Sequence, residues 1–455
     1  MISEKFFDRM RDLLAKDFDD FEAALEKSCV RAIRVNTTKI APDRFLEITK
    51  HSLRPLSYCS DGFIPEVQEG LGAYAEHHCG AYYVQDPGAM ATVNALDVPR
   101  GAWVLDCCSA PGGKASQLAS LIGDEGFILA NEYVPKRAKI IVSNFERLGI
   151  RNAMVVSMDT AELSRMFRGA FDIILCDAPC SGEGMLRKYD AASEEWSEEN
   201  VALCAARQSE ILDNVIPLVR AGGYLLYSTC TYSTEENERV VIRVLREHPE
   251  LSLVPVKKEL AGVTKDGLAI DGITELKLTR RFYPHVSDGE GQYIALFKKD
   301  ESTSDLSTVL YKDASKSVTK EEKRIVDEFF KSNFERTPCG RLIKHGELVV
   351  LAPHKCPIPS HSVFMPGVAV GEIRKGVLFP HQQLISAYGN DMKRKENLKS
   401  GDVRVEKYLR GEEIAAVDVT DNGWCAVCYE GMTLGGGKVS SGVIKNHYPK
   451  GLRTK

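Results

Sequence analysis

The sequence predicts an α/β protein whose centre is a doubly wound, mostly parallel β-sheet, with smaller regions before and after it. Short apolar runs recur between residues 103 and 297, separated by helical or turn-rich segments, which is typical of right-handed βαβ units. Each run is apolar at consecutive positions, which indicates a sheet covered on both faces. The expected strands are residues 103–108, 127–132, 153–158, 171–177, 223–229 and 293–297.

The regions on either side of this sheet have a different character. Apolar side chains at helical spacing predict a helix over residues 6–14, and the basic segment RAIRVNTTK at 31–39 is strand-like. After the last strand, residues 298–322 are polar and rich in serine, threonine and charge, as linkers are. A chain of 455 residues exceeds one ordinary core. The predicted divisions are an N-terminal extension (1–96), the sheet domain (97–299), a linker (300–322), a small mixed domain (323–370) and a C-terminal domain (371–455).

Composition and charge exclude several classes of protein. With 44% hydrophobic and 27% charged residues, the chain is neither collagen-like nor disordered. The net charge of −5 excludes a uniformly basic protein, yet residues 371–455 hold 14 lysines and arginines against 10 acids, whereas residues 1–370 hold 45 against 54. The 13 cysteines, several inside strand-like runs, indicate a reducing cytoplasm rather than a disulfide framework. The absence of a secretory apolar region, and of the run of about 18 apolar residues that spans a membrane, predicts a cytoplasmic protein.

Polar or glycine-rich residues follow the first four expected strands. The first strand leads into Cys107-Cys108-Ser109-Ala110-Pro111-Gly112-Gly113-Lys114 before a helical stretch. Small residues at a strand–helix turn allow a nucleotide-like ligand to approach the backbone and the helix N-terminus, although a tight chain reversal has the same composition. Glu132, Asp159 and Asp177 follow the next three strands. An acid after the second strand is typical of ribose binding, with helix capping as the alternative. Together they predict a ligand crevice at the carboxyl edge of the sheet.

Two cysteines follow neighbouring strands at this edge. Cys180 lies three residues after Asp177, and Cys230 follows the fifth strand. A lone cysteine is usually a small buried hydrophobe, but two of them near a predicted crevice favour nucleophilic chemistry. Cys107 and Cys176 are expected in the core. Cys425 and Cys428 form a single C-x-x-C in an apolar segment, which favours strand packing over a metal site.

Four segments resemble, in order and spacing, the successive motifs of the NOL1/NOP2/Sun family of RNA 5-methylcytosine methyltransferases. They are LDCCSAPGGKASQLA, NEYVPKRAKIIVSNFERLGIRN, FDIILCDAPCSGEGMLRK and YSTCTYSTEENERVV. The likeness extends from about Arg31 to Phe297, and the C-terminal GMTLGGGKVSSGVIKNHYPKGLR resembles the PUA-like domain of the family's bacterial small-subunit rRNA branch. The chain departs from the family at Gln292-Tyr293-Ile294, where the family has aromatic residues.

The resemblance implies a Rossmann-like core that uses S-adenosylmethionine (SAM), with an N-terminal α+β RNA-binding extension and a C-terminal PUA-like domain. By matching position, Cys108–Lys114 would hold the methionine part of SAM, Glu132 the ribose and Asp159 the adenine, with Asp177 between cofactor and target base. Arg137 matches a basic position of the second motif. The residues alone leave open which thiol attacks cytosine, since DNA cytosine methyltransferases use a Pro-Cys thiol, which would point to Cys180. The family resembled here implies Cys230 as the nucleophile and Cys180 in adduct breakdown.

The expected partner is small-subunit (16S) rRNA, free or in an assembled particle, with no metal and a monomeric protein. Basic residues proposed to meet phosphates are Arg31, Arg34, Lys39, Arg187, Lys188, Arg280 and Arg281, and the acid-free C-terminal stretch 435–455. The rival hypotheses are an RNA-binding ribosome assembly factor, a tRNA cytosine methyltransferase, and a small-molecule or protein methyltransferase of the same fold. The last needs no pair of thiols.

Overall fold

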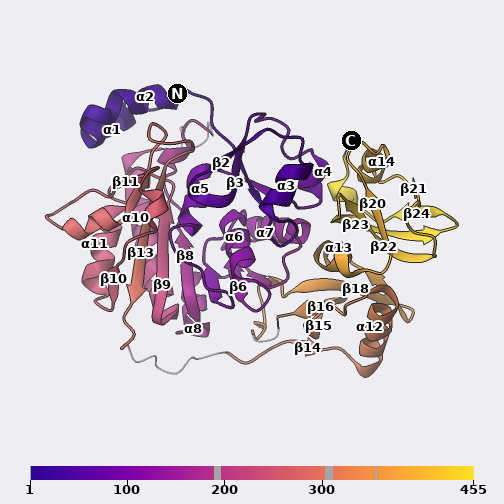
Figure 1. The fold of residues 1–455 in the computed structure, drawn as a ribbon. Helices are drawn as coiled ribbons and strands as arrows, with labels where there is room; N and C mark the ends of the chain where they lie inside the picture. Colours follow the sequence, from indigo (N-terminus) through magenta and orange to yellow (C-terminus); the bar gives the residue numbers. More distant parts are fainter. Residues whose placement is uncertain (1, 189–195, 303–310, 354–355, 455) are drawn as a thin grey trace.

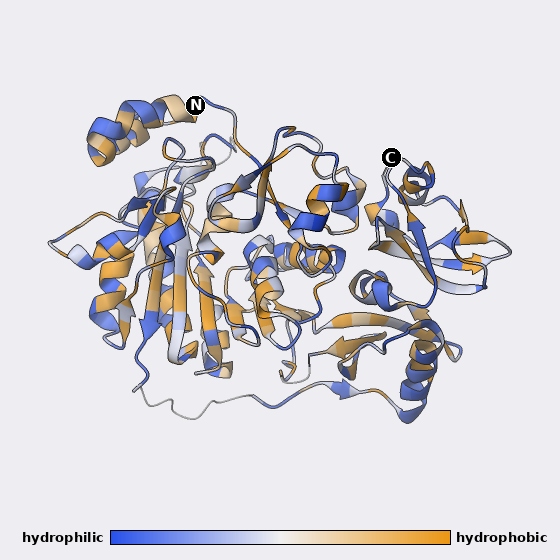
Figure 2. Ribbon diagram, in the orientation of Figure 1, coloured by the Kyte–Doolittle hydropathy of each residue, from blue (hydrophilic) through white to orange (hydrophobic). Residues whose placement is uncertain are grey.

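The computed structural model describes residues 2–188, 196–302, 311–353 and 356–454. The N-terminal helices and a small sheet lie above a large central sheet, and the C-terminal third of the chain forms two further sheets beside it (Figure 1). Apolar residues gather in the central strands and on the inner sides of the helices (Figure 2). Among the described residues, no helix combines the length and apolar character needed to cross a membrane.

The central sheet confirms the predicted α/β core. Within the described residues it has ten strands, in the order β11-β12-β13-β9-β8-β5-β6-β7-β17, with β10 also paired to β13. The strands are β5 (Trp103–Asp106), β6 (Phe127–Asn131), β7 (Ala153–Val156), β8 (Phe171–Asp177), β9 (Val219–Thr229), β10 (Leu251–Leu253), β11 (Lys265–Asp266), β12 (Arg280–Phe282), β13 (Gln292–Lys299) and β17 (Val363–Met365). The five strands β7-β6-β5-β8-β9 are mutually parallel. The order reverses at β5, so a crevice is expected at the carboxyl ends of β5 and β8.

The last expected strand, residues 293–297, runs against its neighbours. β13 pairs antiparallel with both β9 and β12, because the chain reaches β12 first and then turns back between β12 and β9. At the opposite edge, β17 adds to β7 in antiparallel register. The sheet is therefore parallel in the middle and antiparallel at both margins.

Helices cover both faces of the sheet, which explains the apolar runs. Alternate residues of a strand point to opposite faces: Leu105 packs in a core with α8, α10 and α11, whereas Val104 packs in another with α6 and α7. The helices are α6 (Gly113–Ile122), α7 (Pro135–Leu148), α8 (Thr160–Met166), α10 (Glu198–Val215) and α11 (Glu238–Glu247). Short 3-10 turns are η1 (Ala15–Asp17), η2 (Glu183–Met185), η3 (Ile216–Leu218), η4 (Lys258–Leu260), η5 (Thr274–Leu278), η6 (Gly389–Asp391) and η7 (Lys450–Leu452).

The N-terminal region consists of a helical pair and a four-stranded sheet. α1 (Glu4–Leu14) and α2 (Phe18–Leu25) pack through phenylalanines against Trp196, Tyr232 and Tyr283 of the central domain. The sheet has the order β2-β3-β1-β4. Its elements are β1 (Ala32–Val35), α3 (Pro42–Ile48), β2 (Leu53–Leu56), β3 (Cys59–Pro65), α4 (Ala75–His78), β4 (Tyr82–Gln85) and α5 (Pro87–Val93).

Two five-stranded sheets make up the C-terminal third. The first has the order β14-β15-β16-β18-β19 and the second the order β20-β22-β23-β24-β21. Their strands are β14 (Lys316–Ser317), β15 (Arg341–His345), β16 (Leu348–Ala352), β18 (Val368–Arg374), β19 (Val377–Pro380), β20 (Lys395–Leu398), β21 (Ile414–Ala415), β22 (Gly423–Tyr429), β23 (Met432–Ser440) and β24 (Val443–Asn446). The helices are α12 (Lys320–Asn333), α13 (Gln382–Tyr388) and α14 (Arg404–Arg410).

Two predicted domain limits fall on ordered elements. The division at residue 370 lies inside β18, which pairs on both sides and continues to Arg374. The predicted linker 300–322 lies partly outside the described residues, at 303–310, and its end already contains β14 and the start of α12. The first C-terminal sheet thus spans residues 316–380.

The C-terminal domain docks onto the N-terminal region. The Tyr448 hydroxyl lies 2.9 Å from Nδ1 of His78, and the Lys39 ammonium donates to the carbonyls of Cys79 (2.6 Å) and Thr433 (3.4 Å). Apolar residues of both regions share one core. Burial lowers the pKa of Lys39 to about 8. The C-terminal domain and the N-terminal region are therefore packed against each other beside the central sheet.

Candidate active site

The glycine-rich turn joins β5 to α6 at the switch point of the sheet. Gly112 has φ 102°, a left-handed conformation that favours glycine, and caps α6. Ser109 N–H bonds the Asn131 carbonyl of the neighbouring strand (2.8 Å), and Asn131 itself is buried and bridges Cys107 and Met158. Asn131 was not among the predicted site residues, although a polar residue ending an apolar strand was a usable signal. Its hydrogen bonds connect the loops that follow the three adjacent strands β5, β6 and β7.

Two buried polar atoms at this turn have no partner among the described residues. They are Oδ1 of Asp106, at the end of β5, and the Ser109 hydroxyl. Burial, followed by the nearby Asp177 carboxylate, raises the pKa of Asp106 well above its usual range. Buried polar groups are normally satisfied, so these two atoms are suited to a polar ligand held by the turn.

The acids after β6 and β7 lie at the same edge. Glu132 is 4% exposed, accepts a hydrogen bond from Val134 N–H (2.9 Å) and lies 3.4 Å from the Arg137 guanidinium. Asp159 is exposed and caps α8 through Ala161 N–H (2.8 Å). Glu132 therefore bonds a backbone N–H two residues further on without capping α7, whereas Asp159 caps α8, and both lie at the carboxyl edge.

Cys180 and Cys230 face each other across the crevice. Their sulfur atoms are 3.2 Å apart, and both side chains are half-buried. Gly184 permits the close approach of the two loops: a Cβ there would lie 2.8 Å from the Cys230 carbonyl oxygen, which instead accepts a hydrogen bond from Gly184 N–H (2.8 Å). The hydrogen bond to Cys230, with burial, raises the pKa of Cys180 well above its usual range. Either thiol can donate the hydrogen bond between the two sulfurs.

Asp177 is held on both oxygens. Its Oδ2 pairs with the Lys114 ammonium at 2.8 Å, and its Oδ1 accepts from the Gln292 amide at 3.4 Å. Burial opposes the Lys114 charge, but the Asp177 carboxylate outweighs it and raises the pKa of Lys114. Lys114 was predicted only as part of the turn, and Gln292 only as a departure from the family. The structure brings both to the carboxylate that precedes Cys180.

Several predicted phosphate contacts are wrong, because the side chains are used inside the protein. Arg34 is 2% exposed and donates to Gln85, Gly113 and Ser116. Arg187 pairs with buried Glu290 at 2.7 Å, and Arg281 pairs with buried Glu238. Lys39 holds the backbone carbonyls described above, and Arg280 is bonded to Asp266.

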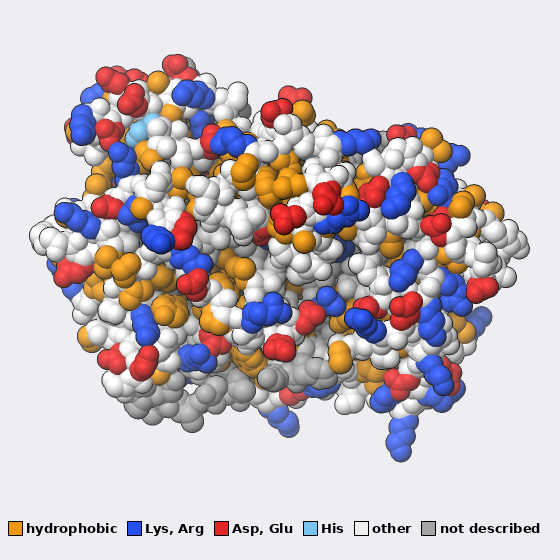
Figure 3. Space-filling model, viewed as in Figure 1, with side chains coloured by type: hydrophobic (Ala, Val, Ile, Leu, Met, Phe, Trp, Pro, Cys, Tyr) orange, Lys and Arg blue, Asp and Glu red, His pale blue; other side chains and the backbone are white. Residues whose placement is uncertain are grey.

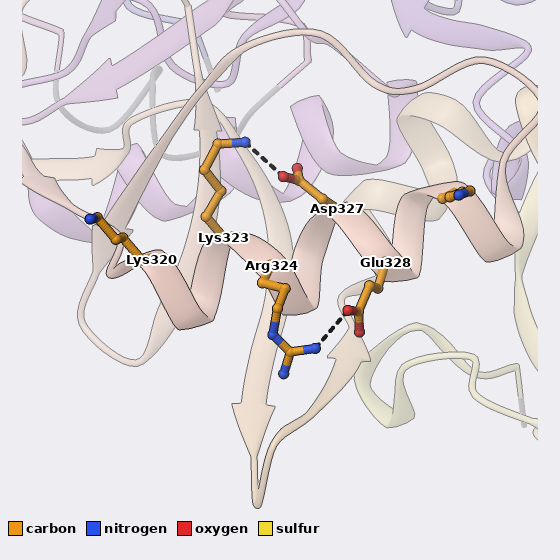
Figure 4. Close-up of a pocket in the computed structure, with 6 residues that line it drawn as sticks. Lys320, Lys323, Arg324, Asp327 and Glu328 are labelled. Atoms are coloured by element: carbon orange, nitrogen blue, oxygen red, sulfur yellow. Dashed lines mark hydrogen bonds and ion pairs between the residues drawn. The ribbon is translucent and has the colours of Figure 1, made fainter.

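The other cysteines behave as predicted core residues. Cys107, Cys176, Cys425 and Cys428 are at most 2% exposed, the last two in β22. The described part of the chain contains no cluster of histidine, cysteine or acid side chains that could hold a metal ion. A hollow on α12 is a different feature: Lys323 pairs with Asp327 and Arg324 with Glu328 along one helix (Figure 4). Such pairs mark a solvated face.

Comparison with known proteins agrees with this architecture. Family models described as the N-terminal domain of 16S rRNA methyltransferase RsmF, 16S rRNA methyltransferase RsmB/F, and the methyltransferase RsmF PUA domain match residues 2–87, 93–298 and 395–454. A methyltransferase homolog from Pyrococcus horikoshii superposes with a TM-score of 0.58 and 29% identity, covering 65% of this chain and 95% of that one.

Two curated relatives match almost the whole chain. Ribosomal RNA small subunit methyltransferase F of Vibrio vulnificus (strain YJ016) is 31% identical over 99% of this chain and 97% of its own length. The protein of the same name from Klebsiella pneumoniae (strain 342) is 32% identical over 99% and 96%. The chain therefore belongs to the ribosomal RNA small subunit methyltransferase F family.

Proposed function

We propose that this protein methylates carbon 5 of cytosine in small-subunit rRNA, using SAM, through a covalent bond between Cys230 and the base. The observation that carries the proposal is the pair of thiols 3.2 Å apart beside Asp177. Direct methyl transfer to an oxygen or nitrogen needs no thiol, whereas carbon 5 of cytosine is a poor nucleophile and needs activation. Family membership supports rRNA as the substrate.

The glycine-rich turn and the acids beside it form the proposed SAM site. When bound, SAM supplies an electrophilic methyl group. Residues Cys108–Lys114 would hold its methionine part, where the unpartnered Ser109 hydroxyl and Asp106 oxygen offer polar contacts. Glu132 would bind the ribose and Asp159 would lie against the adenine, both at the carboxyl edge where such ligands bind. Arg137, 3.4 Å from Glu132, fixes that carboxylate from outside.

Cys230 makes and breaks the bond to the base. Its thiolate adds to carbon 6, which turns the ring into an enamine-like nucleophile, and a carbon–carbon bond forms at carbon 5 as the sulfonium–methyl bond breaks. A base then removes the carbon-5 proton, and the electron pair expels Cys230 from carbon 6. The family resemblance assigns Cys180 to this second half, and the distance of 3.2 Å between the two sulfurs supports the assignment because it keeps Cys180 beside the adduct.

Asp177 is suited to contact ring N3. A proton on N3 withdraws electrons from the ring and favours thiolate addition at carbon 6, and a carboxylate paired with Lys114 would stabilise that proton by accepting a hydrogen bond from it. Lys114 and Gln292 fix the carboxyl group from two sides. The Asp177 side chain is 29% exposed, so part of it remains open toward the crevice.

The test of the proposed function is a bisulfite map of rRNA and tRNA from cells with and without the protein. We expect at least one cytosine in small-subunit rRNA to lose its protection from bisulfite when the protein is absent. Loss of protection only in tRNA would support the rival tRNA enzyme. No change in either RNA would favour the assembly-factor hypothesis.

The C-terminal domain presents a row suited to RNA. Trp424, Lys438 and Lys445 lie opposite one another on β22, β23 and β24, the Lys438 ammonium lies 6.0 Å from the Trp424 ring, and exposed His447 packs edge-on against that ring. A half-buried aromatic ring and an exposed histidine beside two exposed lysines offer stacking and phosphate contact together. On the face seen in Figure 3, by contrast, positive and negative side chains are interspersed.

Replacing Lys438 and Lys445 with alanine is expected to weaken RNA binding without changing SAM affinity. Each lost phosphate contact should reduce the slope of log affinity against log salt by about 1. The control is Lys323→Ala on α12, whose charge is paired with Asp327. An unchanged salt slope in the double variant would contradict this surface. Truncation at residue 370 is unsuitable because it cuts β18.

A further inference from the structure

Each cysteine loop is bound by a buried glutamate of the other loop. Glu236, which follows Cys230, accepts both the backbone N–H (2.9 Å) and the hydroxyl of Ser181, the residue after Cys180. Glu183, from the Cys180 loop, accepts the hydroxyl of Thr231 (2.9 Å) and the N–H of Tyr232 (3.0 Å). Each loop thus supplies a glutamate to the other, and each glutamate contacts the residue that directly follows the other loop's cysteine.

Two further contacts complete this connection. The Ser181 and Thr231 hydroxyls lie 3.0 Å apart, between the two glutamates. Asn237 holds the residues on either side of Cys230: its Oδ1 accepts from the Thr229 hydroxyl (2.6 Å), and its amide donates to the Thr231 carbonyl (3.0 Å). Cys230 is therefore held by both of its neighbours, and Cys180 by the residue that follows it.

Both glutamates are also held by a second donor. Glu236 is 0% exposed and also accepts from the Gln208 amide at 2.8 Å. Glu183 is 2% exposed and accepts from the Trp196 indole at 3.0 Å. The backbone N–H groups, the indole and the Gln208 amide nitrogen can only donate, whereas a hydroxyl can donate or accept. An apolar side chain at either position would therefore leave buried donors without an acceptor, which is costly.

We propose that Glu183, Glu236 and Asn237 are positioning residues that set the distance between the two thiols and their relative orientation. Replacing a buried acceptor shifts the loop that it binds, and proximity effects make thiol chemistry sensitive to such shifts. The consequence for catalysis rests on the proposed function, whereas the geometry of the thiol pair can be measured without RNA or SAM.

The experiment compares Glu236→Leu with Glu235→Leu in the full chain. Glu235 is the adjacent acid, but it contacts Arg9, Ser233 and Thr234 and not the Cys180 loop. Each protein is treated with diamide, which takes two electrons and two protons from a thiol pair to form a disulfide. The rate of Cys180–Cys230 linkage is followed by the mass of the joined peptides, alongside the melting temperature.

We expect the wild type and Glu235→Leu to form this disulfide quickly, and Glu236→Leu to form it roughly tenfold or more slowly. Ser181→Ala, which keeps the glutamate, should slow it too, and the double variant should add less than the sum of the two effects. Turnover should fall with the linkage rate, while KM for SAM stays constant.

Equal linkage rates in folded Glu236→Leu, Ser181→Ala and wild type would overturn the proposal. If Glu236→Leu does not fold, Ser181→Ala decides alone. A wild type that links its thiols quickly but methylates no RNA would refute the proposed function and leave the positioning role intact.

Discussion

Replacing Cys230 with alanine is expected to abolish methyl transfer and to leave no covalent protein–RNA species, whereas replacing Cys180 with alanine should let that species accumulate. Without the Cys230 thiol, carbon 6 has no nucleophile, and turnover should fall by at least about 10⁴-fold. Without Cys180, addition and methyl transfer proceed, but the base that releases the enzyme is missing. The measurement is a denaturing gel of the full-length protein incubated with small-subunit rRNA and SAM.

Two controls make this result specific. Cys204→Ala removes a thiol on α10 that lies outside both cysteine loops, and it should keep turnover and show no trapped species. The double variant lacking both Cys180 and Cys230 should show no adduct, because the nucleophile is gone. A trapped species in Cys230→Ala and not in Cys180→Ala would reverse the two roles.

The geometry of the two thiols depends on more than their positions in the sequence. The sequence places Cys180 and Cys230 after adjacent strands, and the apolar runs locate those strands well. It does not reveal that the sulfurs lie 3.2 Å apart, because the contacts proposed to set that distance, from Glu183 and Glu236, join loops about 50 positions apart. Local sequence patterns predict the strands, whereas the geometry of the site depends on tertiary contacts.

The direction of the edge strands also could not be predicted from the sequence. β13 is apolar along its length, as the parallel strands are, but it enters from the opposite end because β12 precedes it. The pattern of apolar side chains indicates which residues are buried, but it does not indicate the direction in which the strand runs. The polar Gln292 at the start of β13 was a signal of a different kind, since it is buried and bonded to Asp177.

Charge was the least reliable guide. Arg34, Arg187 and Arg281 lie in basic segments, yet each is buried with partners distant in sequence. Glu238 and Glu290 supply two of those partners, 43 and 103 positions away. A buried arginine is retained only when such donors and acceptors are satisfied, and sequence alone does not show the partner. The exposed lysines of β23 and β24 remain as the residues proposed to meet RNA.

Asp177→Asn is expected to reduce turnover by about 10²- to 10⁴-fold, because a neutral amide stabilises a protonated N3 much less than a carboxylate does. The change also leaves Lys114 without its carboxylate. Burial then outweighs the remaining influences, so the pKa of Lys114 should fall, and the free energy of unfolding should drop by about 1–2 kcal/mol. Pre-steady-state adduct formation and thermal unfolding measure the two effects separately.

The second variant separates chemistry from stability. Asp177→Asn combined with Lys114→Met removes the stranded charge, so it should recover most of the lost melting temperature but none of the lost rate of adduct formation. Gln292→Leu, which removes the amide contacts to Oδ1 and to the Ser228 hydroxyl, should have a much smaller effect on that rate. Recovery of activity in the double variant would mean that Asp177 serves only to neutralise Lys114, and its proposed contact with the base would be withdrawn. Retention of turnover within about tenfold in Asp177→Asn alone would exclude stabilisation of a protonated N3 by the charge of this residue.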